Sequence, residues 1–190
     1  MKIESLKKIG KITYKGKDSN EMFAFKHYNP DEVILGKKMR DHLKFAMSYW
    51  HTLVASGTDI FGGPTSDKTF GKQNPMDIYK AKADFGFQLM DLLQIDYYCF
   101  HDVDIAPEGK TLKESFDNMD EMVDYIAKLQ EQYNKKLLWG TANNFGDKKF
   151  MLGAATSANA DVFAISAAKV KKAIDATIKL GGSGYVFWGG

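Results

Sequence analysis

Three stretches of the chain carry apolar residues at the three- and four-residue spacing of an amphipathic helix. The first opens at Asn74 and Pro75, where Asn74 suits the N-cap and Pro75 suits the first helical position. The second opens at Thr111, which Glu114 follows three residues later in the capping-box pattern. The third opens at Asn159. The pattern therefore predicts three helices, which extend to about residues 93, 129 and 180.

Four short apolar runs alternate with these helices and are predicted to be β-strands. They comprise residues 45–50, 97–100, 137–142 and 185–188. Runs that are apolar throughout are typical of parallel strands covered on both faces. Alternation of strands and helices implies right-handed crossovers, so the sequence predicts one α/β domain without internal repeats.

Residues 1–40 precede this alternation and are predicted to be an N-terminal extension packed on the outside of a domain at 41–190. Residues 7–17 fit either a short hairpin or an irregular arm. The aromatic stretch 22–28 ends at Asn29 and Pro30, which form a turn signal.

Composition and charge narrow the class of protein. The chain has 190 residues, 44% hydrophobic and 26% charged, which is the balance of a soluble globular protein. A net charge of +2 argues against nucleic acid as the main partner. No apolar run reaches the roughly 18 to 20 residues of a membrane span. The single cysteine, Cys99, cannot form an internal disulfide, which fits a cytoplasmic location.

Polar and aromatic residues follow the predicted strands at the end where parallel α/β folds place their sites. His101 and Asp104 are the sharpest pair, because a carboxylate on one imidazole nitrogen fixes the tautomer and leaves the other nitrogen for a substrate. Aromatic walls with a few hydrogen-bonding groups suit a sugar. The other residues at these strand ends are Trp50, Thr141, Phe145 and Trp188.

Structural explanations remain open for the same residues. His101 could bind a loop carbonyl while Asp104 caps a helix, and each tryptophan is more often a core residue than a pocket wall. Cys99 lies inside an apolar strand and fits an inert buried thiol. The glycine-rich stretch 57–64 lacks the spacing and the Lys-Ser/Thr ending of a phosphate loop, and no dinucleotide-binding pattern opens a helix.

Several longer motifs carry a family resemblance, in order and over essentially the whole chain. They closely resemble segments of the xylose isomerases, in the class that has a longer N-terminus. The motifs are YWHT at 49–52, GTDIFG at 57–62, FHDVDIAPEG at 100–109, LWGTAN at 138–143, GAATS at 153–157, NADVF at 159–163 and YVFWGG at 185–190.

The resemblance implies a TIM barrel that interconverts D-xylose and D-xylulose, with D-glucose as a side substrate, by ring opening and a hydride shift. It implies two divalent ions (magnesium, manganese or cobalt) and a homotetramer. By resemblance, His101 assists opening of the sugar ring and Asp104 orients the His101 side chain. The matched pocket residues are Trp50, Thr141, Phe145 and Trp188, with Phe61 reaching into a neighbouring subunit's site.

Two departures limit what the chain is expected to do. The segment after Asn143 differs from the family's usual pattern, which predicts a changed loop. A TIM barrel also needs eight strands and about 250 residues, whereas this chain supplies four strands with three connecting helices. In the family, the metal ligands lie in a second half that follows Trp188-Gly189-Gly190, so no metal ligand is predicted here. One hypothesis is the N-terminal part of a xylose isomerase; the alternative is an inactive half-barrel that binds sugar weakly or needs a complementary half.

Overall fold

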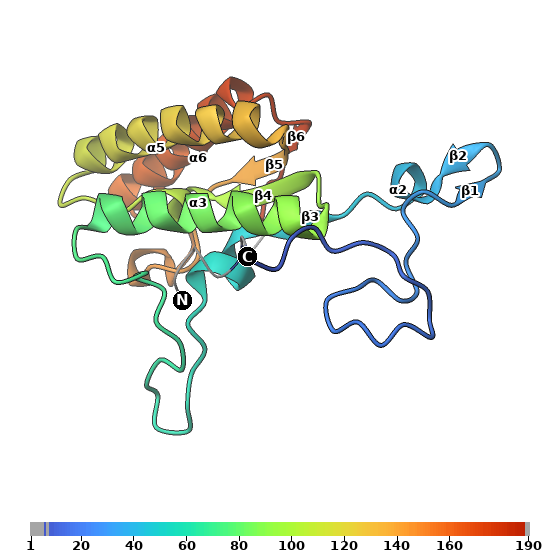
Figure 1. Ribbon diagram of the computed structural model, residues 1–190. Coiled ribbons are helices and arrows are strands. Elements are labelled where there is room, and N and C mark those ends of the chain that lie inside the picture. The colour runs from blue at the N-terminus through green and yellow to red at the C-terminus, as the bar shows by residue number, and fades with distance from the viewer. Residues whose placement is uncertain (1–5, 7, 189–190) are drawn as a thin grey trace.

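The computed structural model describes residues 6 and 8–188, so Gly189 and Gly190 of the last motif lie outside the described residues. A four-stranded parallel sheet forms the centre of the molecule, and three long helices connect its strands (Figure 1). The strands are β3 (Ala46–Ser48), β4 (Tyr97–His101), β5 (Lys136–Thr141) and β6 (Gly184–Tyr185). The helices are α3 (Pro75–Leu93), α5 (Leu112–Tyr133) and α6 (Ala160–Lys179).

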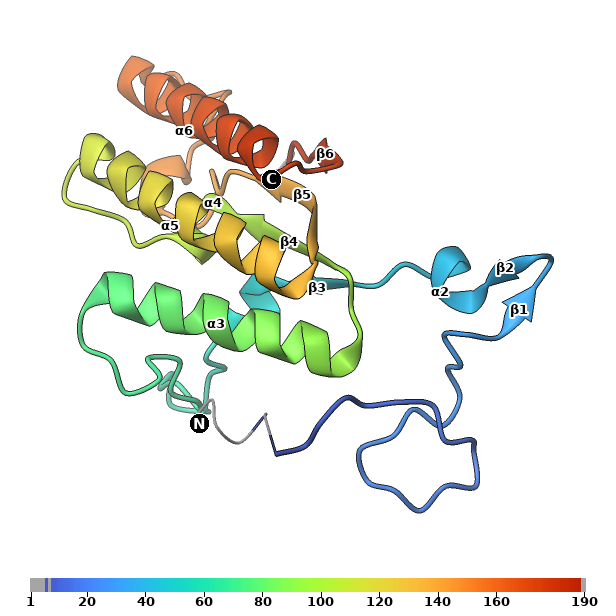
Figure 2. The same cartoon turned by 45° about the horizontal axis from the view of Figure 1, so that its top comes forward.

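The strands lie in the sheet in the order β3-β4-β5-β6, which is their order along the chain. Successive parallel strands joined by crossovers of one hand place every connecting helix on the same face. Figure 2 shows α3, α5 and α6 side by side over one face of the sheet. The predicted α/β class is therefore confirmed, and this sequential arrangement is compatible with part of a TIM barrel. A doubly wound sheet would instead carry helices on both faces.

The core lies between the sheet and these helices. On α5, the buried positions follow the helical spacing that the sequence predicts. They pack against the aromatic side chains of β4 and the apolar face of α3. Fully buried side chains of this core are Phe87, Met90, Tyr98, Phe100, Met122, Ile126 and Leu137.

The predicted helix starts agree with the structure. Asn74 Oδ1 accepts hydrogen bonds from Met76 N and Asp77 N, and Asn159 caps α6 in the same way. Thr111 Oγ1 accepts from Glu114 N at 3.1 Å, but the Glu114 carboxylate accepts from Lys110 N. Only the forward half of the predicted capping box is therefore present.

Two predicted strands are shorter than the sequence suggested. Residues 45–50 supply only three strand residues, because the chain then enters a π-helical turn at Trp50–Val54, closed by Ala55 N donating to Trp50 O. Residues 185–188 supply Tyr185 alone, joined to Gly184 in β6. Among the described residues β6 pairs with β5 only, and Val186 N still donates to Gly140 O just past its end.

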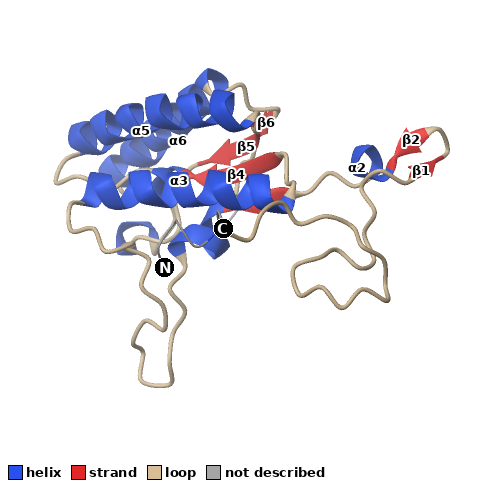
Figure 3. Ribbon diagram, in the orientation of Figure 1, coloured by secondary structure: helices blue, strands red, loops and turns tan. Residues whose placement is uncertain are grey.

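The N-terminal region is an irregular arm with a hairpin in an unexpected place. Residues 7–17 form no hairpin among the described residues; an isolated bridge joins Tyr14 to Phe25. The antiparallel pair is instead β1 (Val33–Ile34) with β2 (Lys37–Lys38), followed by the short helix α2 (Met39–His42). Figure 3 shows this arm as mostly loop that projects from the helical body.

The arm is attached to the body at the C-terminal end of α3. Ile12 N donates to Leu92 O at 2.9 Å, and Gln94 Nε2 donates to Ile12 O at 2.7 Å. Tyr28 packs edge-on against Phe45 just before β3. No helix in the described part of the chain combines the length and apolar character needed to cross a membrane.

Gly140 tests the packing between β5 and α6. A Cβ there would overlap Thr177 Oγ1 and lie 3.0 Å from Phe100 Cζ, so Gly140→Ala forces neighbouring groups to move. We expect it to lower the free energy of unfolding by about 1–3 kcal/mol, as overpacking of a core does. The control is Gly184→Ala, also in a strand, where a Cβ would meet nothing within 4 Å. Urea unfolding of the three proteins measures the difference, and equal stabilities would contradict the packing.

Candidate functional site

A buried histidine–aspartate pair lies where β4 ends. His101 is the last residue of the strand, and Asp104 lies in the helical turn α4 (Asp102–Ile105) that follows directly. Asp104 Oδ2 accepts from both the backbone N and the ring Nδ1 of His101, each at 2.8 Å. Only 6% of His101 and 4% of Asp104 is exposed. The Asp104 carboxylate therefore caps the α4 turn and also fixes the His101 imidazole.

This hydrogen bond determines which imidazole nitrogen is available for a ligand. Because Nδ1 donates to a carboxylate oxygen, neutral His101 carries its proton on Nδ1 and leaves Nε2 as an acceptor. His101 Nε2 is buried and has no hydrogen-bond partner among the residues that the structure describes. A buried polar atom without a partner is costly, and such atoms need an explanation such as a functional role.

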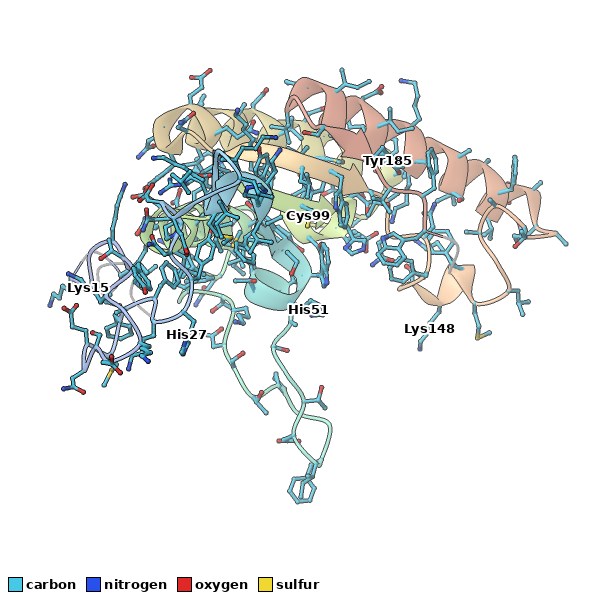
Figure 4. The ribbon with its side chains drawn as sticks, turned by 90° about the vertical axis from the view of Figure 1, so that its right-hand side faces the viewer. Lys15, His27, His51, Cys99, Lys148 and Tyr185 are labelled. Carbon is cyan, nitrogen blue, oxygen red and sulfur yellow. The ribbon has the colours of Figure 1, made fainter. Side chains whose placement is uncertain are left out.

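Aromatic rings from three other segments surround this imidazole. The centroid of the Trp50 ring lies 4.8 Å from that of His101, and the Phe145 centroid lies 5.7 Å away, both edge-on. The Trp188 ring is stacked with the imidazole, with 6.2 Å between the centroids. With Asp104, the structure thus brings together five of the predicted site residues, and the four rings among them come from the ends of all four strands. Figure 4 labels one residue from each of three neighbouring segments: His51 after β3, Cys99 in β4 and Tyr185 in β6.

Thr141 and Phe61 stand apart from this group. Thr141 is 1% exposed, and its hydroxyl donates to Val186 O at 2.5 Å, which ties the end of β5 to the chain after β6. It lines a cleft of about 310 Å³ together with Phe145 and Trp188. Phe61 is 90% exposed in the long loop between Val54 and α3, which projects from the body in Figure 1.

The described residues do not fit a divalent metal centre. Magnesium and manganese sites need several converging oxygen or nitrogen ligands. In residues 6 and 8–188, no three His, Cys, Asp or Glu side chains come together in that way. The two carboxylates nearest the site are already engaged, Asp104 by His101 and Asp102 by Lys169.

Comparison with known proteins gives strong matches to one kind of enzyme. The chain is 53% identical over 182 residues to a protein named xylose isomerase from Allorhizobium ampelinum, covering 96% of this chain and 42% of that protein. It is 50% identical over 189 residues to one from Thermoanaerobacter sp. and 54% identical over 183 residues to one from Cereibacter sphaeroides. The chain is a homologue of the xylose isomerases.

The homology covers this chain almost completely but its relatives only in part. The chain spans about two fifths of the length of the curated xylose isomerases that it matches. No protein-family model matches the chain. The resemblance read from the motifs is confirmed, and a xylose isomerase is the enzyme with which the site must be compared.

A second buried pair, Asp102 with Lys169, lies at the same end of the sheet, and neither residue is among those predicted from the sequence. Asp102 Oδ2 lies 3.3 Å from Lys169 Nζ, and both residues are buried. Burial raises the pKa of the Asp102 carboxyl, while Lys169 and the backbone N–H groups of Asn143 and Val103 oppose that rise. A sequence signal existed, because Lys169 occupies a position on the buried face of α6 between Ser166 and Ala173.

Cys99 matches the prediction of a buried thiol. It is 5% exposed within β4, and its Sγ lies 3.7 Å from Met47 O. Burial raises the pKa of the thiol to about 11, so the reactive thiolate is scarce near neutral pH.

Asp104→Ala tests how the imidazole is held. The variant removes the acceptor for both His101 N and Nδ1, so we expect the Nδ1–H tautomer to lose its excess and the chain to lose about 1–3 kcal/mol of stability. Long-range ¹H–¹⁵N NMR of histidine-labelled protein, with the imidazole neutral, reports the tautomer. The control is Asp161→Ala, an exposed acidic residue in the first turn of α6. An unchanged His101 spectrum in Asp104→Ala would refute the assigned hydrogen bond.

Proposed function

We propose that this chain is the N-terminal part of a class II xylose isomerase, an enzyme that interconverts D-xylose and D-xylulose. Residues 41–190 would supply the first four strands and three connecting helices of a TIM barrel, and residues 1–40 an N-terminal extension. The proposal is supported by the homology and by the sequential parallel sheet with its long helices on one face. One observation carries the proposal. The buried Nε2 of His101 has no hydrogen-bond partner among the described residues, and the aromatic side chains of Trp50, Phe145 and Trp188 surround the imidazole.

The histidine–aspartate pair would open the sugar ring. His101 Nε2 accepts the proton of the anomeric hydroxyl and returns it to the ring oxygen, so the ring C–O bond breaks as the aldehyde forms. The Asp104 carboxylate at Nδ1 stabilises the imidazolium that exists between the two transfers. Asp104 also keeps the ring from rotating, because it holds the backbone of the same residue.

The aromatic side chains would form the walls of the sugar pocket. Indole and phenyl faces pack against the C–H faces of a sugar and exclude water, while the sugar hydroxyls need polar partners. The rings of Trp50, Phe145 and Trp188 all lie near His101, with centroids 4.8–6.2 Å from that of the imidazole. Thr141 lines the adjoining cleft with Phe145 and Trp188.

Other parts of the proposal concern the longer protein. We propose that it binds two divalent ions through residues outside this chain, and no step above runs through them. We further propose a cytoplasmic homotetramer that acts on D-xylose and D-glucose and has no nucleic-acid or membrane partner. Phe61 would then cover a neighbouring subunit's site, which suits an aromatic side chain that is 90% exposed on a projecting loop.

A chimera tests the activity. Residues 1–190 replace the matching segment of the Thermoanaerobacter xylose isomerase, and conversion of cyclic D-xylose to D-xylulose is measured. We expect activity, and we expect His101→Gln to lower it by roughly 10²- to 10⁴-fold, the usual contribution of general acid–base catalysis.

The matched control in the chimera is His27→Gln, because His27 is exposed on the N-terminal arm. This variant is expected to keep the activity of the unsubstituted chimera. A folded chimera in which His101→Gln and His27→Gln have equal rates would remove His101 from the mechanism.

The 190-residue chain alone is expected to bind sugar weakly without turning it over. Its described residues assemble no divalent metal site, and both Phe145 and Trp188 are about half exposed. The test incubates the chain with D-xylose and magnesium, manganese or cobalt, and measures D-xylulose. Tryptophan fluorescence in the same samples reports binding. Turnover by this chain alone would show that the remainder of a relative is dispensable.

A further inference from the structure

The peptide backbone of Asn143 is held by the buried pair Asp102 and Lys169 from both sides. Asp102 Oδ1 accepts from Asn143 N at 2.7 Å, and Lys169 Nζ donates to Asn143 O at 3.0 Å. The two side chains also face each other, with 3.3 Å between Asp102 Oδ2 and Lys169 Nζ. Asn143, the second residue after β5, is therefore fixed by one charge from the start of α4 and one from α6.

Burial makes the two charges depend on each other. The side chains of Lys169 and Asp102 are only 7% and 10% exposed. Removing one partner of such a pair leaves an uncompensated buried charge, which is strongly unfavourable. The other groups facing Lys169 are weaker partners: Glu108 Oε1 at 3.7 Å on a half-exposed side chain, and the ring of Phe150 at 5.6 Å. The pair can thus act as a rigid clamp.

The Asn143 side chain continues the connection towards the site. Its Oδ1 accepts from Phe145 N at 3.2 Å and from Gly146 N at 2.7 Å. These bonds fix the backbone from which the Phe145 ring reaches His101, at 5.7 Å between centroids. Lys169 makes no contact with the imidazole itself among the described residues. Its influence on His101 can pass through this loop or through Asp102, the residue directly after His101, and the experiment below separates the two routes.

We propose that Asp102 and Lys169 are positioning residues that hold Phe145 against the His101 imidazole. They would do so by clamping the Asn143 peptide. This inference rests on the proposed function only in taking Phe145 as a wall of the sugar pocket. The clamp itself is a property of this chain.

NMR of the 190-residue chain tests the clamp without any turnover. Phe145→Leu removes the ring current of Phe145 and shifts the ring-proton resonances of His101, which sets the reference. We expect Lys169→Met to shift the same resonances in the same direction, since Phe145 moves away. In the double variant, Lys169→Met should add no shift to that of Phe145→Leu.

Two further variants separate the clamp from a general loss of charge. Lys171→Met is the control, because Lys171 lies on the same helix, is 74% exposed on its side chain and pairs with Asp175. It should leave the His101 resonances unchanged. Lys169→Arg keeps a buried cation able to donate to Asn143 O and should stay near the wild-type spectrum.

Two results would overturn the proposal. The first is a folded Lys169→Met protein with wild-type His101 resonances while Phe145→Leu shifts them. The second is a shift from Lys169→Met that persists in full in the Phe145→Leu background, which would mean that the coupling bypasses Phe145.

A measurement on the unsubstituted chain decides the case in which Lys169→Met does not fold. A clamped Asn143 N–H should be protected from hydrogen exchange, whereas exchange at the rate of an open loop would refute the clamp. Neither measurement uses enzymatic activity, so the two proposals can fail separately. If the NMR or exchange data refute the clamp while the chimera is active, only the positioning role is rejected. If the clamp is confirmed while the chimera is inactive, only the proposed reaction is rejected.

Discussion

Pairing of each parallel strand with the next strand in sequence is the constraint on which the rest of the molecule depends. It gives the order β3-β4-β5-β6, and with crossovers of one hand it places α3, α5 and α6 over the same face. Because all four strands are parallel, their carboxyl ends meet at one edge. Residues separated by well over a hundred positions, such as Trp50 and Trp188, can therefore approach the same imidazole.

At that edge, satisfying buried polar groups determines the detailed geometry. The end of β4 turns at once into α4, which buries two carboxylates within three residues of each other. Asp104 is satisfied by its own strand residue, His101, and Asp102 by the loop after β5 and by Lys169 on α6. The α4 turn is thus bonded to the end of β4, to the loop after β5 and to α6. His101 Nε2 is one of the buried side-chain atoms that have no partner among the described residues.

The features that the sequence predicts best are those set by interactions between residues close together in the chain. Helix starts at Asn74, Thr111 and Asn159 follow from side-chain capping, and the α/β alternation follows from periodicity. The sequence fails where tertiary contacts decide, as when the chain leaves β3 for a π-helical turn at Trp50. For Lys169 the sequence gives only part of the answer: a lysine on an apolar helix face signals a buried charge, but its partners lie on other elements. The motifs identified the homology because it rests on the order of residues in the chain, and recognising that order requires no knowledge of tertiary contacts.

The histidine–aspartate pair and the aromatic pocket around it differ in how much of the chain must fold to form them. The His101–Asp104 contact spans three residues and lies in one strand end and one turn, so local folding is enough to form it. The aromatic walls come from three separate segments, and Phe145 and Trp188 are still about half exposed in the folded chain. A sugar held here would pack against apolar rings on one side and face water on the other, where interactions between polar groups are weak. The described residues therefore assemble in full the buried pair to which we assign proton transfer, whereas two of the three aromatic side chains proposed as pocket walls remain about half exposed.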